Sequence, residues 1–189
     1  LPGAQRVDVA SLDDVTAVLK RGTANRSTGA TQLNSCSSRS HAILCLELTI
    51  PDPSGPEGGT LRPKLLFVDL AGSERSKRAG TSGQSLVEGN AINESLSCLG
   101  NVIQALVKKQ PHVPYRDSSL TKVLADSLGG NSQTLMLACL SPAEADALET
   151  LSTLHCVRAA RMIVNKPRAV RATAPELSAV EQSERTLAK

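Results

Sequence analysis

The sequence of 189 residues is nearly devoid of aromatic side chains: it has one Phe, Phe67, one Tyr, Tyr115, and no Trp. Proteins that bind single-stranded nucleic acids usually stack bases on aromatic rings, so a nucleic acid is not indicated as a partner. With 40% hydrophobic residues, the chain can still bury a core of ordinary size, built from Leu, Val, Ile and Ala. The net charge of +3 favours an acidic partner surface without identifying it.

The five cysteines are scattered, without a CxxC pair or a His at metal-ligand spacing, so neither a zinc site nor a disulfide framework is indicated. We expect buried thiols in a reducing compartment. No apolar run reaches the roughly 20 residues that cross a bilayer, and the first residues do not resemble a signal peptide. A soluble cytoplasmic protein without a membrane span is therefore expected. Leu1 in place of Met predicts that the chain begins inside a longer one.

Hydrophobic periodicity predicts strands alternating with helices, and therefore an α/β sandwich whose active edge lies at the strand ends. Residues 23–40 and 72–83 are expected to be loops, and 51–59 a hairpin-like turn. Residues 7–22 are expected to form a helix entered through a cap at Ser11 and Asp14, and residues 42–50 a strand. A second strand, buried on both faces, is expected over 65–70, followed by a long helix capped at Ser85 and Glu88 and running to Leu106. The chain should then form a helix over 117–129, a buried strand over 135–140 and a helix starting at Ser141.

The sequence also lacks a phosphate-binding loop of the form GxxxxGK[ST], and it contains no Gly-Lys dipeptide. Such a loop surrounds the β- and γ-phosphates of a nucleotide with backbone amides and a Lys. By itself, this stretch is therefore predicted neither to bind ATP tightly nor to hydrolyse it.

Asp69 and Gly72 directly follow the predicted strand over 65–70. An Asp in this position can reach a nucleotide-bound Mg²⁺, usually through water, and a Gly amide can approach the γ-phosphate because no side chain blocks it. A plain turn after a strand is the alternative interpretation.

A serine-rich loop supplies complementary groups. Ser37 and Ser38 carry hydroxyls that can bind Mg²⁺ or hold a water near the phosphate, and the guanidinium of Arg39 matches the carboxylate of Glu74. A latch between Arg39 and Glu74 that closes only around the γ-phosphate would convert hydrolysis into loop motion. A capped, solvated serine loop is the alternative.

Taken together, several segments resemble successive parts of the kinesin motor domain, in family order, over roughly residues 1–167. The segments are NSCSSRSH (34–41), DLAGSE (69–74), AINESLSCLGNVIQAL (91–106), HVPYRDSSLTKVLADSLGGNSQT (112–134), LACLSP (137–142) and ETLSTLHCVRAARMIVNKP (149–167). The resemblance implies a three-layer α/β sandwich with a central mixed β-sheet flanked by helices, of the P-loop NTPase type, with its N-terminal part missing. Residues 168–189 would be a neck linker or the start of a stalk.

The resemblance also implies the function, an ATP-dependent microtubule motor that uses ATP and Mg²⁺. Two loops would sense the nucleotide. Switch I would contain Asn34, Ser37, Ser38 and Arg39, and switch II would contain Asp69, Gly72 and Glu74. Ser38 and Asp69 would serve the metal, and the relay helix over 91–106 would dock on tubulin. The side chains expected to face the acidic tubulin surface lie on both sides of that helix: Lys77, Arg78, Lys108, Lys109, His112, Tyr115, Arg116 and Lys122.

Two departures from the family pattern remove positive charge from the expected track-binding face. Glu94 and Ser119 stand where the family commonly has Lys. If attraction to tubulin is electrostatic, this protein should bind microtubules more weakly or with a steeper salt dependence than a typical member.

Alternatives remain at this point. A truncated, non-hydrolysing module that binds microtubules or a partner agrees with the absent phosphate loop, whereas a small GTPase-like switch lacks the guanine-reading NKxD sequence. Several kinesin subfamilies with an N-terminal motor stay open, chromosome-associated ones included, as do a homodimer formed through a downstream stalk and a place on the spindle. An unpaired apolar sheet edge would make the isolated chain poorly soluble.

Overall fold

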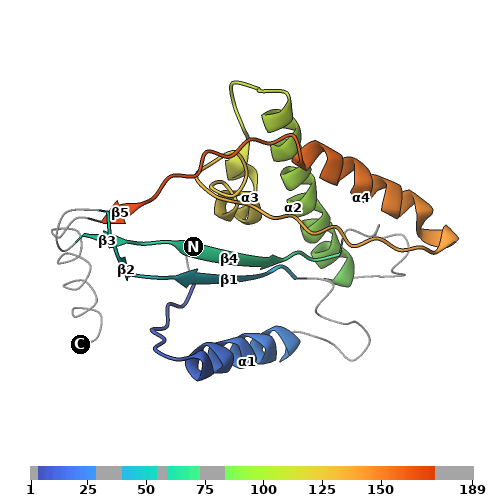
Figure 1. Ribbon diagram of the computed structural model, residues 1–189. Helices are drawn as coiled ribbons and strands as arrows, with labels where there is room; N and C mark the ends of the chain where they lie inside the picture. Colours follow the sequence, from blue (N-terminus) through green and yellow to red (C-terminus); the bar gives the residue numbers. More distant parts are fainter. Residues whose placement is uncertain (1–3, 29–39, 55–58, 73–83, 173–189) are drawn as a thin grey trace. The chain divides into compact units, whose positions relative to one another are not determined.

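The computed structural model of the protein describes residues 4–28, 40–54, 59–72 and 84–172, with the backbone alone at 27–28, 84–92 and 172 (Figure 1). The chain divides into two compact units. One comprises residues 1–41 and 70–166, and the other comprises residues 42–69 and 167–189.

Helix α1 spans Leu12–Thr28 and is capped at Ser11 and Asp14 as predicted, but it begins at Leu12 and not at the predicted Val7. The Ser11 amide donates to Asp14 Oδ2 over 2.9 Å and the Asp14 amide donates to Ser11 Oγ over 3.2 Å, a reciprocal cap. The predicted end near Gly22 is wrong, because the helix continues to Thr28. One glycine costs a helix only about 1 kcal/mol relative to Ala, which the turns around it can offset.

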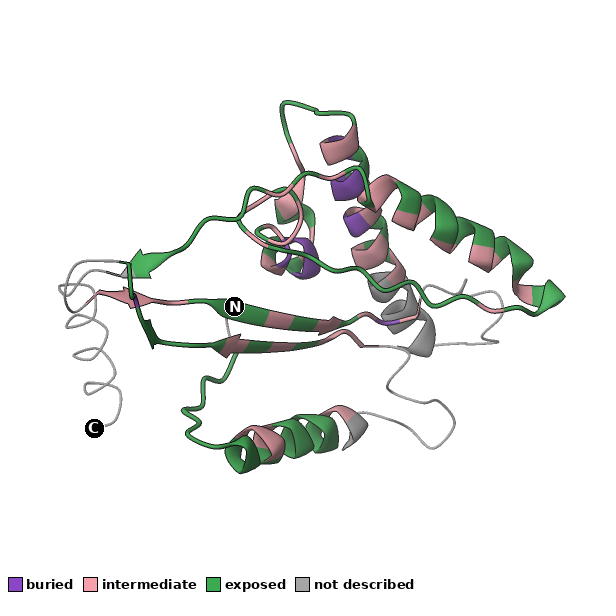
Figure 2. Ribbon diagram, viewed as in Figure 1, coloured by how far each residue is buried: buried purple, intermediate pink, exposed green. Residues whose placement is uncertain are grey.

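The core of the larger unit lies between α2, Gln84–Val107, and α3, Ser119–Val123, which carry most of its buried residues (Figure 2). Those side chains are Leu99, Val102, Ile103 and Ala105 from α2 and Leu120 and Thr121 from α3. The predicted long helix is confirmed, although it begins at Gln84, one residue before the predicted cap at Ser85. Its steps of three and four residues place one apolar face against α3.

The predicted helix over 117–129 is wrong in its extent. A 3-10 turn, η3 (Tyr115–Asp117), precedes α3, and turns follow it. Ser118 separates the two because it is extended and caps α3: its Oγ accepts the Thr121 amide over 3.1 Å, and its own amide donates to Thr121 Oγ1 over 3.2 Å. The helix also ends before the predicted stop at Gly129, because α3 ends at Val123. Gly129 itself has a φ of +82°, and an added Cβ there would lie 2.7 Å from Leu106 Cδ2.

Helix α4, Ala147–Ala160, packs against α2 and follows a 3-10 turn, η4, Glu144–Asp146. The helix predicted to start at Ser141 therefore begins later. The buried strand predicted over 135–140 is wrong: these residues form no strand, and the side chains of Leu135 and Leu137 are 84% and 80% exposed. Apolar residues form a strand only where a neighbouring chain completes the hydrogen-bond ladder, and no segment in the described ranges pairs with this one.

The smaller unit contains an antiparallel pair, β1 (Ala42–Glu47) and β4 (Lys64–Asp69), in a register that runs from Ala42 opposite Asp69 to Glu47 opposite Lys64. Both strands were predicted. The prediction that β4 is buried on both faces is wrong, since Leu65 and Phe67 are 44% and 56% exposed. The side chains of β4 alternate instead, with Leu66 and Val68 half-buried next to these exposed positions.

Beyond β1 the hairpin continues as a small sheet in the order β2-β3-β5, formed by Ile50–Pro51, Thr60–Leu61 and Arg171–Ala172. β2 and β3 flank the turn predicted over 51–59, of which residues 55–58 lie outside the described ranges. The region predicted as linker or stalk thus contributes a short strand to this unit. Arg171 Nε donates to the buried carboxylate of Asp52 over 2.7 Å, and this ion pair ties β5 to the turn after β2.

The cysteines are not uniformly buried, contrary to expectation. Cys45 and Cys139 are exposed, and Cys98 and Cys156 are half-buried. Cys45 lies on the exposed side of the alternating strand β1, and Cys139 belongs to the extended segment after α3. In the described parts of the chain, no helix combines the length and the apolar character needed to cross a membrane.

Candidate functional site

Most of the residues predicted to sense the nucleotide lie outside the described ranges. These are Asn34, Ser37, Ser38, Arg39 and Glu74. Lys77 and Arg78, which were predicted to face tubulin, also lie outside the described ranges. The predicted Arg39–Glu74 latch is therefore not part of the described geometry. Asp69 and Gly72 are described, and the site is built from them.

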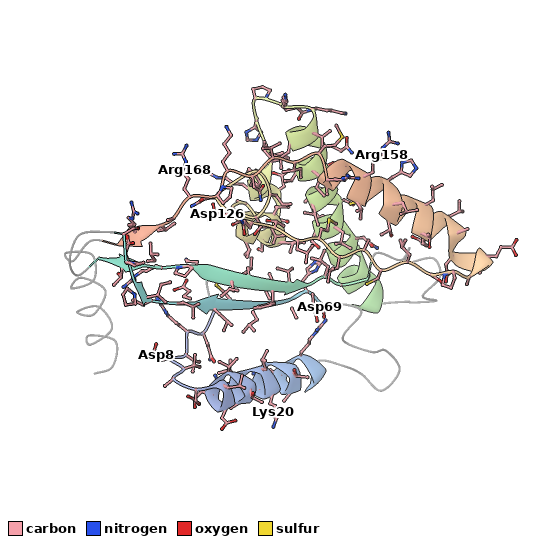
Figure 3. All side chains as sticks on the ribbon, viewed as in Figure 1. Asp8, Lys20, Asp69, Asp126, Arg158 and Arg168 are labelled. Atoms are coloured by element: carbon pink, nitrogen blue, oxygen red, sulfur yellow. The ribbon has the colours of Figure 1, made fainter. Side chains whose placement is uncertain are left out.

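Asp69 is the last residue of β4, where its backbone pairs with Ala42 (Figure 3). Leu70 follows, then Ala71, which is buried, and Gly72, which is half-buried. No group of three or more His, Cys, Asp or Glu side chains within the described residues could hold a metal ion. A single carboxylate at a strand end suits an ion held chiefly by phosphate oxygens and water, as Mg²⁺ usually is beside a nucleotide.

His41 connects this loop to α2, a role that the sequence analysis did not assign. The Ala71 amide donates to His41 Nδ1 over 3.0 Å, and His41 Nε2 lies 2.7 Å from Ser95 Oγ. A backbone amide can only donate, so Nδ1 must be the unprotonated nitrogen. The proton of a neutral ring is then on Nε2, which donates to the Ser95 hydroxyl.

Arg26, in the last turn of α1, contacts the residue before His41. Its Nε donates to Ser40 Oγ over 3.0 Å and its Nη2 to the Ser40 carbonyl over 2.7 Å. Burial of the ring, and secondly the charge of Arg26, lower the pKa of His41 below its ordinary value. Both causes favour the neutral ring, which is the form that accepts the Ala71 amide.

This lowered pKa predicts a loss of stability in mild acid. The unfolded chain protonates His41 near pH 6.5 and the folded chain only below that, so the unfolded state binds more protons between these two values. The free energy of unfolding should therefore fall as the pH drops from 7.5 to 5.5. Replacement of His41 by Asn should flatten that fall, as measured by thermal unfolding of both proteins across this range. Identical pH profiles would contradict the assignment.

The described cationic residues that were predicted to face tubulin are exposed. Lys108, Lys109, Arg116 and Lys122 are exposed, as is His112. Lys109 lies just after the end of α2 and has a φ of 50°. The amide of the next residue, Gln110, donates to the Ala105 carbonyl over 2.9 Å. This geometry turns the chain sharply, and it leaves two adjacent ammonium groups at the end of the helix, next to the η3–α3 region that contacts α2.

Tyr115 differs from its predicted neighbours because its hydroxyl has a partner within the chain. The hydroxyl donates to the Leu128 carbonyl over 2.6 Å, and the ring is half-buried. Burial, with a smaller effect of the Asp126 charge, raises the pKa of this phenol. Its described role is to hold the turn after α3, while its contact with tubulin stays a prediction.

Asn165 is a second residue whose role the sequence did not reveal. The Gly129 amide donates to its Oδ1 over 2.7 Å. Its Nδ2 lies 2.9 Å from the Ser127 carbonyl, 2.8 Å from the Ser132 carbonyl and 3.0 Å from Thr134 Oγ1. One amide side chain thus ties the segment after α4 to the loop after α3.

The chain matches the family model described as kinesin motor domain over residues 1–163. It is 48% identical over 183 residues to the kinesin-like protein KIN-4A of Gossypium hirsutum, a match that covers 88% of this chain and 18% of that protein. It is 49% identical over 168 residues to the chromosome-associated kinesin KIF4 of Xenopus laevis, covering 87% of this chain and 14% of that one.

Solved structures agree. A KIF14 dimer with AMP-PNP, in complex with a microtubule, superposes with a TM-score of 0.76 at 44% identity and covers 85% of this chain and 46% of that one. A fast kinesin superposes with the same TM-score at 43% identity, covering 92% and 49%. The α/β kinesin fold predicted from the sequence is thus confirmed. The chain spans less than a fifth of these two curated relatives and about half of each solved chain.

Proposed function

The chain belongs to the kinesin motor domain family, and we propose that it forms the nucleotide-sensing and track-binding half of an ATP-dependent microtubule motor. The observation that carries this proposal is the connection of the strand-end loop to α2 through His41. His41 accepts the amide of Ala71, which lies between Asp69 and Gly72 in the chain, and it donates to Ser95 of α2. Exposed cations follow the end of α2.

On the nucleotide side, the proposed roles follow from position and chemistry. When bound, ATP with its Mg²⁺ would bring the phosphoryl group that is transferred to water. Ser38 and Asp69 would hold the metal ion, Ser37 and the Gly72 amide would position water and γ-phosphate, and Asn34 would line the nucleotide. Arg39 and Glu74 would form the latch that responds to the γ-phosphate.

On the track side, the proposed partner is the acidic surface of tubulin. The exposed side chains of Lys108, Lys109, Arg116 and Lys122 supply positive charge around the end of α2, and His112 lies between them in sequence. Lys77 and Arg78 would add to this surface, and Tyr115 would support it. A solved relative, the KIF14 dimer, is bound to a microtubule, which supports a cytoskeletal location and agrees with a homodimer formed through a downstream stalk.

This stretch by itself is proposed to be inactive, because it has no phosphate-binding loop. The solved motor chains that it matches are about twice as long. In them, the remaining half would supply the loop and neighbours for the exposed apolar side chains of β4 and of residues 135–140.

The decisive test is the ATPase rate of the full-length protein with and without microtubules, combined with cosedimentation. The motor proposal predicts stimulated hydrolysis and binding that changes with the nucleotide. Salt-dependent cosedimentation that ATP does not affect, without hydrolysis, would contradict the motor and favour a non-hydrolysing binding module.

Restoring one missing charge should strengthen track binding. Ser119 is exposed at the first turn of α3, and replacing it with Lys adds one positive charge next to Arg116 and Lys122. Surface ion pairs contribute up to about 1 kcal/mol, so we expect a two- to fivefold lower Kd for microtubules, on the order of that energy, and a gain that shrinks with salt.

The matched control for this prediction is Ser152→Lys, which adds the same charge at an exposed position of α4, outside the proposed contact surface. Cosedimentation of both variants at several salt concentrations separates a local effect from a change in net charge. Equal gains in the two variants would contradict a track-binding role for the η3–α3 region.

A further inference from the structure

We propose that His41 is a positioning residue that couples the loop after Asp69 to α2, using one ring nitrogen for each. This inference rests on the proposed function, in which that loop senses the γ-phosphate and α2 contacts the track. It concerns side chains other than the predicted Arg39–Glu74 latch. The latch would detect the phosphate, whereas His41 would pass the resulting displacement to the helix.

The geometry supports a rigid link. His41 reaches a backbone amide 30 positions away, at Ala71, and a hydroxyl 54 positions away, at Ser95. An imidazole ring has fixed dimensions, so a donor on one side and an acceptor on the other are held at a fixed separation. The half-buried ring is partly shielded from water, which would otherwise compete for both bonds.

The position of Ala71 makes the link sensitive to the nucleotide. Ala71 is 5% exposed and precedes Gly72, whose amide is proposed to approach the γ-phosphate. A hydrogen bond of 3.0 Å is lost when its length approaches about 3.6 Å, and it weakens steeply when its angle falls below about 120°. A displacement of Gly72 by about an ångström must therefore either break the Ala71–His41 bond or carry the ring, and with it Ser95, along.

The protonation state completes the link. Protonation would place a second hydrogen on Nδ1, directly opposite the Ala71 amide, and that bond would be lost. Arg26, which contacts Ser40 and whose charge acts on the ring, disfavours that protonation. The neutral ring, with its proton on Nε2, is the form that makes both bonds.

Two substitutions remove the hydrogen bond between His41 and Ser95, one by changing each partner. In His41→Asn, the shorter side chain retains an acceptor for the Ala71 amide, because its Oδ1 takes the place of Nδ1, but it does not reach Ser95. Ser95→Ala removes the hydroxyl and leaves the ring in place. Ser152→Ala is the control, because it is the same substitution at an exposed helical position outside the link.

The measurement is the ratio of the microtubule-stimulated to the unstimulated ATPase rate of the full-length protein, at a temperature below the melting temperature of every variant. We expect His41→Asn and Ser95→Ala each to reduce this ratio by about five- to twentyfold, within the range of a typical coupling between sites. The double variant should lose no more than either single one, because both remove one shared interaction. The control should keep the wild-type ratio.

The outcomes separate the two proposals. If the wild-type protein is not stimulated by microtubules, the proposed function fails and this inference fails with it. If the wild type is stimulated and both variants remain within twofold of its ratio, the inference alone is overturned. Additive losses in the double variant would overturn it as well, since separate losses would mean that His41 and Ser95 do not act through one bond. Nitrogen NMR that places the proton of His41 on Nδ1 would also overturn it.

Discussion

Asp69→Asn in the full-length protein is expected to lower microtubule-stimulated ATP hydrolysis by about 100-fold or more, comparable to the loss of other preorganised charged groups in active sites. Asparagine has the size and shape of aspartate but no negative charge, so the attraction to the proposed Mg²⁺ and its water disappears. The backbone pairing of residue 69 with Ala42 does not involve the side chain and should persist. Steady-state hydrolysis at saturating ATP and microtubules measures the loss.

Asp8→Asn is the matched control, because Asp8 is an exposed aspartate before α1 and the change in charge is identical (Figure 3). It should keep the wild-type rate, and both variants should have the wild-type melting temperature. An Asp69→Asn rate within fivefold of wild type would remove Asp69 from the proposed metal site. A large drop in melting temperature would instead assign Asp69 a structural role at the end of β4.

Asn165→Ala is expected to destabilise the junction between the segment after α4 and the loop after α3 by about 1–3 kcal/mol, because a hydrogen bond contributes about 1 kcal/mol net and the groups left behind are partly shielded. The Gly129 amide would lose its acceptor and the Ser132 carbonyl would lose its donor, whereas the Ser127 carbonyl would lose one of two donors and keep the Thr134 hydroxyl. The melting temperature should fall by about 3–10 °C. Hydrogen exchange of the Gly129 amide should accelerate.

Asn165→Asp distinguishes the donor from the acceptor. Aspartate keeps an oxygen for the Gly129 amide but sets its second oxygen against the Ser127 and Ser132 carbonyls, so it should destabilise at least as much as Ala. Asn101→Ala, at an exposed position of α2, is the control and should not lower the melting temperature. A wild-type melting temperature for Asn165→Ala would show that solvent replaces this network without cost.

The long helix was predictable because its signal is local. In α2, the buried Leu99 lies three and four positions before Val102 and Ile103, which are also buried, and no other part of the chain is needed to produce that spacing. The caps at Ser11 and Asp14 are equally local, as each residue reaches the other within one turn. The segments around Asp69 were informative for a related reason, since their order along the chain matches the family.

Residues 135–140 show where local signals are insufficient. Their apolar run satisfies the rule for a strand, yet a strand also requires a partner, and that partner is not encoded in the run. In the same way, the exposure of Phe67 depends on what covers β4, not on the alternation within it. The short α3 follows from Ser118, whose extended backbone restarts the helix at a position that periodicity does not mark.

By itself, the sequence determined the family and the α/β class, because these depend on residue types at fixed separations along the chain. The residues proposed to contact nucleotide and track were named from the same segments. Only the tertiary structure decided that His41 bridges Ala71 and Ser95, and that Asn165 joins two loops. Each of these contacts links positions 30 to 54 residues apart. Hydrogen bonds depend on distances and angles in space, which the spacing of residues along the chain does not fix until the intervening elements have packed.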